Sequence, residues 1–255
     1  MFNFDKRILY VILAIFVIRN IAYRFSSTEG VLMLLLTLPA ILIAITFHEF
    51  AHAYTADKLG DSTPRNQGRL TLNPLKHIDP IGFALLIVSG IGWGKAVQIN
   101  PRNFNRNISM TKAEAIVSVA GPAMNFLLAI VSTIILAVLW KFNVLVNLPT
   151  RTMWLILVFF VELVLINIGL GVFNLIPLPP LDGSKILYHF LPFNGRNWYD
   201  RNEMILYFVF VIIWFSGIAS SGISFVIGET MHGLFTLFGN IFSINLNAIL
   251  TLMGI

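Results

Sequence analysis

The sequence contains no cysteine and few charged residues. Without cysteine, the 255-residue chain has no disulfide bonds, thiolate metal sites or cysteine nucleophiles. Any metal would therefore be held by histidine and carboxylate side chains. Only 11% of the residues are charged while 57% are hydrophobic, and the mean hydropathy is +0.82. Soluble domains contain about 25% charged residues, so this composition predicts an integral membrane protein embedded in a lipid bilayer.

Basic residues exceed acidic ones and give a formal net charge of +5. They are scattered between apolar runs and do not gather on one soluble face, which argues against a nucleic-acid partner. If the amino terminus is cytoplasmic, only Arg19, Arg24, Lys141 and Arg151 of the 17 basic residues lie on the opposite side. The positive-inside rule therefore predicts a multi-pass protein of the cell membrane with both termini in the cytoplasm.

The apolar runs predict six membrane-spanning helices. At about 20 apolar residues per span, the candidates are residues 8–25, 31–56, 111–140, 152–173, 203–227 and 232–253. The first run resembles a signal peptide, but Arg19 and Asn20 end it and no small-residue cleavage motif follows, so a retained span is favoured. In the third run, Gly121-Pro122 predicts a break in the helix.

Residues 81–99 do not fit a membrane span. The apolar run 81–93 is too short to cross a bilayer, and its glycines weaken it as a helix. Its β-branched residues, with residues 95–99 after them, suggest a re-entrant β-hairpin that offers an edge strand to an extended peptide. An interfacial loop is the alternative.

The chain shows no internal repeat and no soluble appendage. It therefore predicts a single membrane domain over residues 1–255, with a motif-bearing core of about 31–185 and the last two spans within 203–255. The predicted fold class is an all-α membrane protein with about six transmembrane helices and one re-entrant β-hairpin between spans two and three.

The second predicted span ends in His48-Glu49-Phe50-Ala51-His52. Two histidines four residues apart lie on one face of a helix, so both imidazoles can reach a single tetrahedral zinc ion. Glu49 is then placed to act as a general base for hydrolysis. Ionisable groups at membrane depth are costly and usually mark function. The alternative is a pair of histidines buried in a core beside an unrelated glutamate.

A catalytic zinc ion usually has three protein ligands, so a third residue must be found elsewhere. Asp182 is favoured because prolines 177, 179 and 180 prevent a regular helix before it and Gly183 permits a tight turn after it. The predicted topology also places Asp182 at the cytoplasmic end of the spans, like His48. Glu162, nearer the middle of the fourth span, remains the alternative ligand.

Three motifs of the chain resemble those of the site-2 protease family (peptidase family M50), zinc metalloproteases that cut within membranes. They are residues 48–52, Gly121-Pro122-Ala123-Met124-Asn125 and Asn174-Leu175-Ile176-Pro177-Leu178-Pro179-Pro180-Leu181-Asp182-Gly183. Residues 73–82 and 92–104 resemble a loop and hairpin of the short bacterial and archaeal members. No PDZ insertion or C-terminal regulatory domain is recognisable. The resemblance covers most of the chain.

The resemblance implies the chemistry of the site. It implies one Zn²⁺ per chain held by His48, His52 and Asp182, with Glu49 as the general base. It also implies that Asn125 and Asn174 face the active site, where their amides would bind substrate or stabilise an oxyanion.

These features together predict an intramembrane zinc metalloendopeptidase. The expected substrates are single-span membrane proteins or signal-peptide remnants, which must unwind because an intact helix hides its carbonyls in hydrogen bonds. The alternative is a multi-span metal-ion transporter that passes the ion along the same His and Asp ligands. Transport favours further ligands in series and needs no glutamate beside the first histidine.

Overall fold

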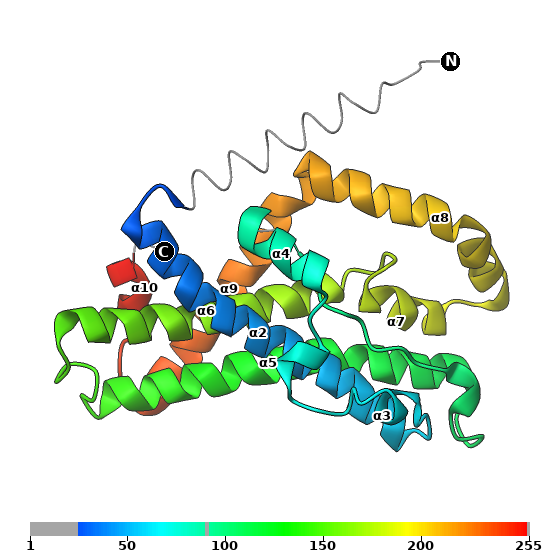
Figure 1. The fold of residues 1–255 in the computed structure, drawn as a ribbon, viewed down its shortest axis with the longest axis horizontal. Helices are drawn as coiled ribbons and strands as arrows, with labels where there is room; N and C mark the ends of the chain where they lie inside the picture. The colour runs from blue at the N-terminus through cyan, green and yellow to red at the C-terminus, as the bar shows by residue number, and fades with distance from the viewer. Residues whose placement is uncertain (1–24, 90–91, 254–255) are drawn as a thin grey trace, which may run out of the picture.

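The computed structural model describes residues 25–89 and 92–253, which form helices joined by turns and irregular segments (Figure 1). The predicted first span, residues 8–25, lies outside the described residues except for Phe25. Helices α2 (Thr28–Lys58), α5 (Met110–Lys141) and α6 (Thr150–Asn174) are long and apolar enough to cross a membrane. Within the described ranges the protein is an all-helical membrane protein.

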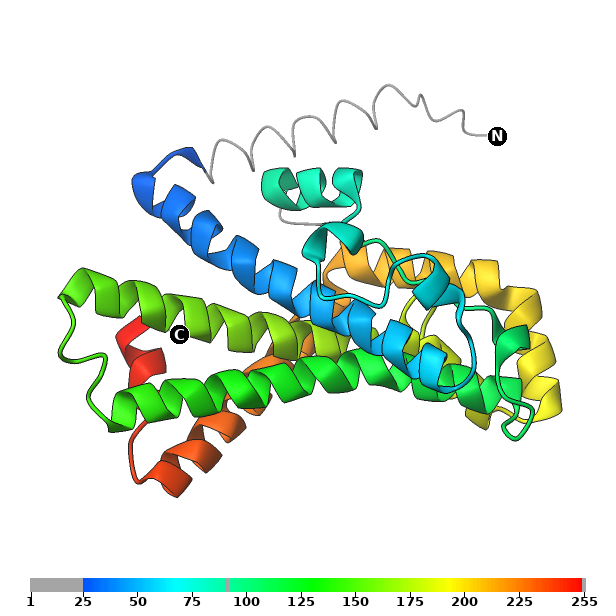
Figure 2. The ribbon, with the colours of Figure 1, turned by 60° about the horizontal axis from the view of Figure 1, so that its bottom comes forward.

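The three apolar helices pack against one another. Helix α2 crosses α5 and α6, which run antiparallel to each other on either side of the turn at residues 142–149 (Figures 1 and 2). The packed face of α2 is made of small residues, including Ala40, Ala44 and Ala56, none of which is exposed. Small side chains let helix backbones approach closely, which is how membrane helices gain packing energy.

Two C-terminal helices cover the other side of α5 and α6. Helix α9 (Ile218–Phe242) packs on both, and the short α10 (Asn247–Met253) packs on α9. The core between these helices includes the fully buried residues Leu136, Val161, Ile168, Phe235, Leu246 and Ile249. This core lies away from the polar end of α2 and stabilises the helices that hold the site.

The remaining elements are shorter or lie outside the bundle, and α3 and η1 among them contact α2. They are α3 (Thr63–Asn66), η1 (Pro74–Lys76), α4 (Pro80–Ser89), η2 (Pro101–Asn103), α7 (Asp182–Phe190) and α8 (Phe193–Ser216). Helix α7 packs on α5. Helix α8 contacts the end of α6, where the rings of Phe173 and Trp214 have centroids 4.7 Å apart.

The re-entrant β-hairpin predicted for residues 81–99 is wrong. Residues 80–89 form helix α4, and Gly94 makes only an isolated bridge with Ile78. Asp79 explains the helix, because its Oδ1 accepts hydrogen bonds from the N–H groups of Ile81 and Gly82 at 3.0 and 2.8 Å. A side-chain cap followed by proline is a strong helix start, and it outweighs the glycine content.

The six predicted spans are not supported, because the last two have wrong boundaries. Gly217, with φ of 73°, ends α8 and begins α9 in the middle of the predicted span 203–227. Ser243, with φ of 54°, ends α9, so the predicted span 232–253 is divided between α9 and α10. A residue in the left-handed conformation stops a helix whatever the hydrophobicity around it. In the described part of the chain, three helices have the length and composition of a span.

Candidate metal centre

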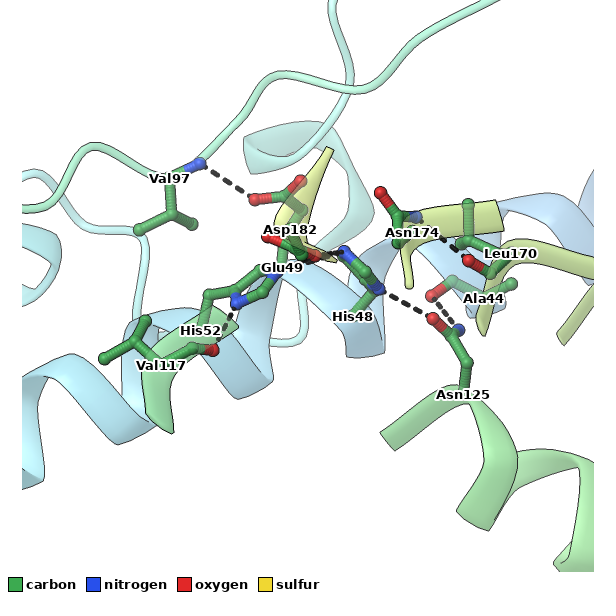
Figure 3. Close-up of polar contacts among 10 residues, drawn as sticks. All are labelled: Ala44, His48, Glu49, His52, Val97, Val117, Asn125, Leu170, Asn174 and Asp182. Carbon is green, nitrogen blue, oxygen red and sulfur yellow. Dashed lines mark hydrogen bonds and ion pairs between the residues drawn. The ribbon is translucent and has the colours of Figure 1, made fainter. Parts of the chain in front are cut away.

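His48, Glu49 and His52 lie near the C-terminal end of helix α2. The two imidazoles are buried one helical turn apart, and their Nε2 atoms are 3.0 Å from each other. Figure 3 shows both rings pointing toward the carboxylate of Asp182. The helical spacing of the motif therefore places both histidines on one face, as the sequence predicts.

Asp182 is the first residue of α7 and follows the proline-rich turn after α6. Its Oδ2 lies 3.3 Å from Nε2 of His48 and 3.1 Å from Nε2 of His52. Glu162 lies elsewhere, because its carboxylate is hydrogen-bonded to Thr37 of α2. Thr37 precedes His48 by three helical turns, or about 16 Å along the axis. The structure thus brings Asp182, and not Glu162, to the two imidazoles.

The outer nitrogens of both imidazoles face hydrogen-bond acceptors. Nδ1 of His52 is 2.7 Å from the carbonyl oxygen of Val117, and Nδ1 of His48 is 2.6 Å from Oδ1 of Asn125. A carbonyl oxygen can only accept, so each Nδ1 carries the ring proton and donates. Each Nε2 then presents a lone pair to the centre, which is the arrangement of metal-binding histidines.

Asn125 is fully buried on α5 and its orientation is fixed by two acceptors. Its Nδ2 donates to the carbonyl of Ala44 at 3.1 Å and to Oδ1 of Asn167 at 2.9 Å. Because the carbonyl of Ala44 can only accept a hydrogen bond, the Asn125 amide nitrogen must face Ala44 and the amide oxygen must face His48. Asn167 is held in turn by the carbonyl of Leu163 at 2.8 Å. The amide of Asn125 is therefore used entirely within the protein.

Three hydrogen-bond acceptors lie close together with no donor between them. They are Nε2 of His48, Nε2 of His52 and Oδ2 of Asp182. Oδ2 of Asp182 is buried and has no hydrogen-bond partner, although both Nε2 atoms are close to it. Buried lone pairs at this separation repel one another unless a proton or a metal cation lies between them, and the three side chains form a group that could hold a metal ion. Zinc bonds of about 2.0 Å in tetrahedral geometry place ligand atoms about 3.3 Å apart. The observed separations of 3.0 to 3.3 Å fit that requirement.

Two glycines let the chain approach the centre closely. A Cβ on Gly121 would lie 2.4 Å from Nε2 of His52 and 2.6 Å from Cε1 of His48. A Cβ on Gly183 would lie 2.3 Å from the carbonyl oxygen of Leu175. Helix α5 continues through Gly121-Pro122, so the predicted break is wrong. Position 121 requires glycine because α5 packs directly on the imidazoles of His48 and His52.

A cavity of about 160 Å³ opens beside the three converging side chains. Its walls include Glu49, Asn174 and residues Val97 and Ile99 of the segment that the sequence predicts to face substrate, and sequence reasoning missed the lining residues Ser118 and Lys185. Lys185 lies three residues after Asp182 on α7, a helical spacing that could have revealed it. Asn174 ends α6, and its Nδ2 donates to a backbone carbonyl four residues earlier at 3.0 Å.

Glu49 is oriented by the backbone. Its Oε2 accepts a hydrogen bond from the N–H of Val97 at 2.8 Å (Figure 3). No side-chain pattern reveals a backbone donor, so the sequence contains no signal for this contact. The sequence does mark Asn167 as a candidate functional residue, because it is a polar residue within the apolar run of the predicted fourth span.

Comparisons with known proteins agree with this chemistry. Residues 150–217 match the model of Peptidase family M50. A Bacillus subtilis (strain 168) protein named "Putative zinc metalloprotease YwhC" is 34% identical over 202 residues, which are 79% of this chain and 90% of that protein. A Mycolicibacterium smegmatis protein named "Putative zinc metalloprotease Rip2" is 33% identical over 160 residues, 60% of this chain and 56% of that protein. No solved structure gives a significant match. The chain therefore belongs to peptidase family M50, the site-2 protease family, and is a zinc metalloendopeptidase.

Proposed function

We propose that this peptidase cleaves membrane-spanning segments of other proteins, or signal-peptide remnants, at a zinc ion held by His48, His52 and Asp182. Glu49 acts as the general base. The observation that carries the proposal is that these four side chains share one cavity at the end of an apolar helix long enough to cross a membrane. Substrates that are themselves apolar can approach such a site from the bilayer.

The residues of the site divide the catalytic work. Bound zinc supplies a Lewis acid that polarises the scissile carbonyl and lowers the pKa of water. Glu49 takes the proton from the attacking water and delivers it to the leaving amine. Asn125 keeps His48 in the metal-binding tautomer, so we assign it a positioning role. Asn174 lies at the cavity wall, where its amide is placed to contact substrate or a developing oxyanion.

The size of the cavity favours an extended substrate. A helix with its side chains is about 10–12 Å across, which a cavity of about 160 Å³ does not admit. Helical carbonyls are also hidden in hydrogen bonds, so attack requires local unwinding. We therefore propose that the scissile segment enters the site as an unwound stretch of a single-span protein or of a signal-peptide remnant.

The distribution of basic residues supports a multi-pass protein of the cell membrane with the metal centre at the cytoplasmic side. Residues 58–112, which connect the metal-centre end of α2 to that of α5, contain eight Lys and Arg. The opposite connection contains two, Lys141 and Arg151. Cytoplasmic connections carry the excess of basic residues, so the metal-centre end faces the cytoplasm in this proposal, together with both termini.

No observation favours the metal-transporter alternative. Residues 25–89 and 92–253 contain a single group of three or more His, Cys, Asp or Glu side chains able to hold an ion, namely His48, His52 and Asp182. A transport path needs binding groups in series across the membrane. Glu49 beside the first ligand has a role in hydrolysis and none in transport.

The proposal is tested by comparing membrane proteomes of cells that carry the wild-type protein or Glu49→Gln. We expect one or a few single-span proteins or signal-peptide remnants to accumulate uncut in the variant. Glu162→Gln is the matched control, since it also neutralises a carboxylate of an apolar helix, and its proteome should match the wild type. Accumulation of soluble proteins alone would reject a membrane-embedded substrate.

A further inference from the structure

Residues 95–100, which we name the crossing segment, run along one wall of the metal cavity without belonging to a helix or a sheet. Val97 and Ile99 line that wall, and the N–H of Val97 donates to Glu49 (Figure 3). A segment without a ladder has no regular hydrogen bonds to set its position. Other groups must therefore hold its backbone in register with Glu49.

Arg69 anchors the start of the crossing segment. Its guanidinium donates to the carbonyl of Lys76 and to the carbonyl of Lys95, and the side chain is 5% exposed. The N–H of Lys95 also donates to the carbonyl of His77 at 2.8 Å. The rigid fork of an arginine can hold two acceptors at a fixed separation. Arg69 thereby joins the loop before α4 to the first residue of the crossing segment.

Asp61 anchors the other end. It is fully buried, and its Oδ2 accepts the N–H of Asn100 at 2.7 Å. Its Oδ1 accepts the N–H of Thr63 and the Nδ2 of Asn103, both at 3.0 Å. Burial alone would raise the pKa of the Asp61 carboxyl, but the hydrogen bond from the Thr63 hydroxyl, together with those from the N–H of Asn100, Asn103 Nδ2 and the N–H of Thr63, holds it below its usual range. The carboxylate thus stays charged and binds the end of the segment by charge-assisted hydrogen bonds.

We infer that Arg69 and Asp61 are positioning residues, which fix the crossing segment at both ends so that the N–H of Val97 holds one oxygen of Glu49. Neither residue lines the metal cavity. The inference rests on the proposed role of Glu49 as general base. A base held in one orientation meets its proton without reorganisation, and a displacement of about 1 Å can lower the rate about 100-fold.

The first test measures the anchoring without any substrate. Hydrogen exchange of the Val97 amide and zinc content are measured in the purified full chain for Arg69→Met, Arg69→Lys and Asp61→Ala. We expect exchange at Val97 to rise about tenfold or more in Arg69→Met and Asp61→Ala, because the segment opens locally. The milder Arg69→Lys should show a smaller rise, and zinc content should stay at the wild-type level.

Gln67→Ala is the matched control. Gln67 belongs to the same loop as Arg69 and touches the crossing segment, but only through a bond between exposed side chains, from its Nε2 to Oε1 of Gln98 at 2.9 Å. Exchange at Val97 should be unchanged in this variant. Wild-type exchange at Val97 in both Arg69→Met and Asp61→Ala would overturn the inference.

The second test measures the catalytic consequence. The probe is a fluorogenic peptide of about 20 apolar residues with a central Gly-Pro, presented in detergent micelles. We expect Arg69→Met and Asp61→Ala to lower kcat by about 10- to 100-fold with KM nearly unchanged. Replacing Val97 by its α-hydroxy acid puts an ester oxygen in place of the N–H while keeping the side chain, and should lower kcat equally.

A double-mutant cycle separates positioning from a general structural effect. If Arg69 acts through the Val97 N–H, then Arg69→Met added to the α-hydroxy acid variant lowers kcat no further. Additive losses would overturn the inference, as would an unchanged kcat when exchange at Val97 has risen. If the wild-type protein leaves the probe uncut while exchange responds as expected, the anchoring stands and the proposed peptidase activity on this substrate class fails.

Discussion

His48 on α2 and Asn125 on α5, 77 residues apart in sequence, are joined by a 2.6 Å hydrogen bond between Nδ1 and Oδ1. The amide of Asn125 is held in turn by the carbonyl of Ala44 on α2 and by Asn167 on α6. The orientation of a candidate metal ligand therefore depends on how three apolar helices pack together. Outer hydrogen bonds of this kind fix the tautomer of a ligating histidine and raise its affinity for metal.

We expect Asn125→Ala to weaken zinc binding by about 10- to 100-fold, because His48 loses the acceptor that holds its proton on Nδ1. Competition with a zinc chelator measures the change. Asn174→Ala is the control. Asn174 lines the cavity, but its amide donates to the carbonyl of Leu170 and not to either imidazole. The Asn174 variant should keep wild-type zinc affinity and lose cleavage rate. Equal zinc affinity in the Asn125 variant and the wild type would refute the positioning role of Asn125.

Gly121→Ala should lose zinc. Its Cβ would lie 2.4 Å from Nε2 of His52 and 2.6 Å from Cε1 of His48, so either the rings or α5 must move. Gly222→Ala in α9 is the matched control, because a Cβ there has no atom within 4 Å. That change should preserve zinc and raise stability by up to about 1 kcal/mol through helix propensity. Zinc content and thermal unfolding measure both effects, and full zinc occupancy in Gly121→Ala would contradict the packing described for α5.

The identity of the third zinc ligand is tested by removing each of two candidate carboxylates in turn. Asp182→Ala should abolish stoichiometric zinc binding, since it removes the oxygen that both Nε2 atoms face. Glu162→Gln should keep stoichiometric zinc binding, because the Glu162 carboxylate is hydrogen-bonded to Thr37, away from the imidazoles. Elemental analysis of the purified variants reports the zinc content. The opposite pattern would make Glu162 the ligand.

Because His77 is buried, we expect the stability of the folded protein to depend on pH. His77 is fully buried, and burial lowers its pKa even though its ring donates to the carbonyl of Thr71. The unfolded chain therefore binds a proton at this residue near pH 6.5 while the folded chain does not. Stability from this source is complete above pH 6.5 and falls as the pH drops below it. Thermal unfolding from pH 7.5 to 5.5 should show a shallower decline in His77→Gln than in the wild type, and identical slopes would contradict the neutral buried imidazole.

The sequence predicted which side chains come together at the candidate metal centre, because the signals for them are carried by side chains. Helical spacing places His48 and His52 on one face, and prolines before Asp182 interrupt the chain where it must turn toward them. Asn167 and Lys185 also carried signals that were overlooked. The contact between Glu49 and the N–H of Val97 had none, since every residue other than proline has the same backbone donor.

The boundaries of the helices were harder to predict than the metal centre. In a membrane protein both faces of a helix are apolar, so hydrophobicity marks a span without showing where it ends. The ends depend on local backbone chemistry. Asp79 and Pro80 start α4 where a hairpin was predicted, and Gly217 separates α8 from α9 inside a predicted span. Attention to caps and left-handed glycines would have corrected both predictions.

We propose that Glu49 is the base at a zinc ion that His48, His52 and Asp182 hold without it. The most direct measurement is zinc stoichiometry and cleavage by Glu49→Gln in the same preparation, with the fluorogenic apolar peptide as substrate. We expect about one zinc per chain and a loss of cleavage by about two orders of magnitude or more. Loss of zinc together with cleavage would place Glu49 among the ligands, and cleavage at the wild-type rate would remove it from the mechanism.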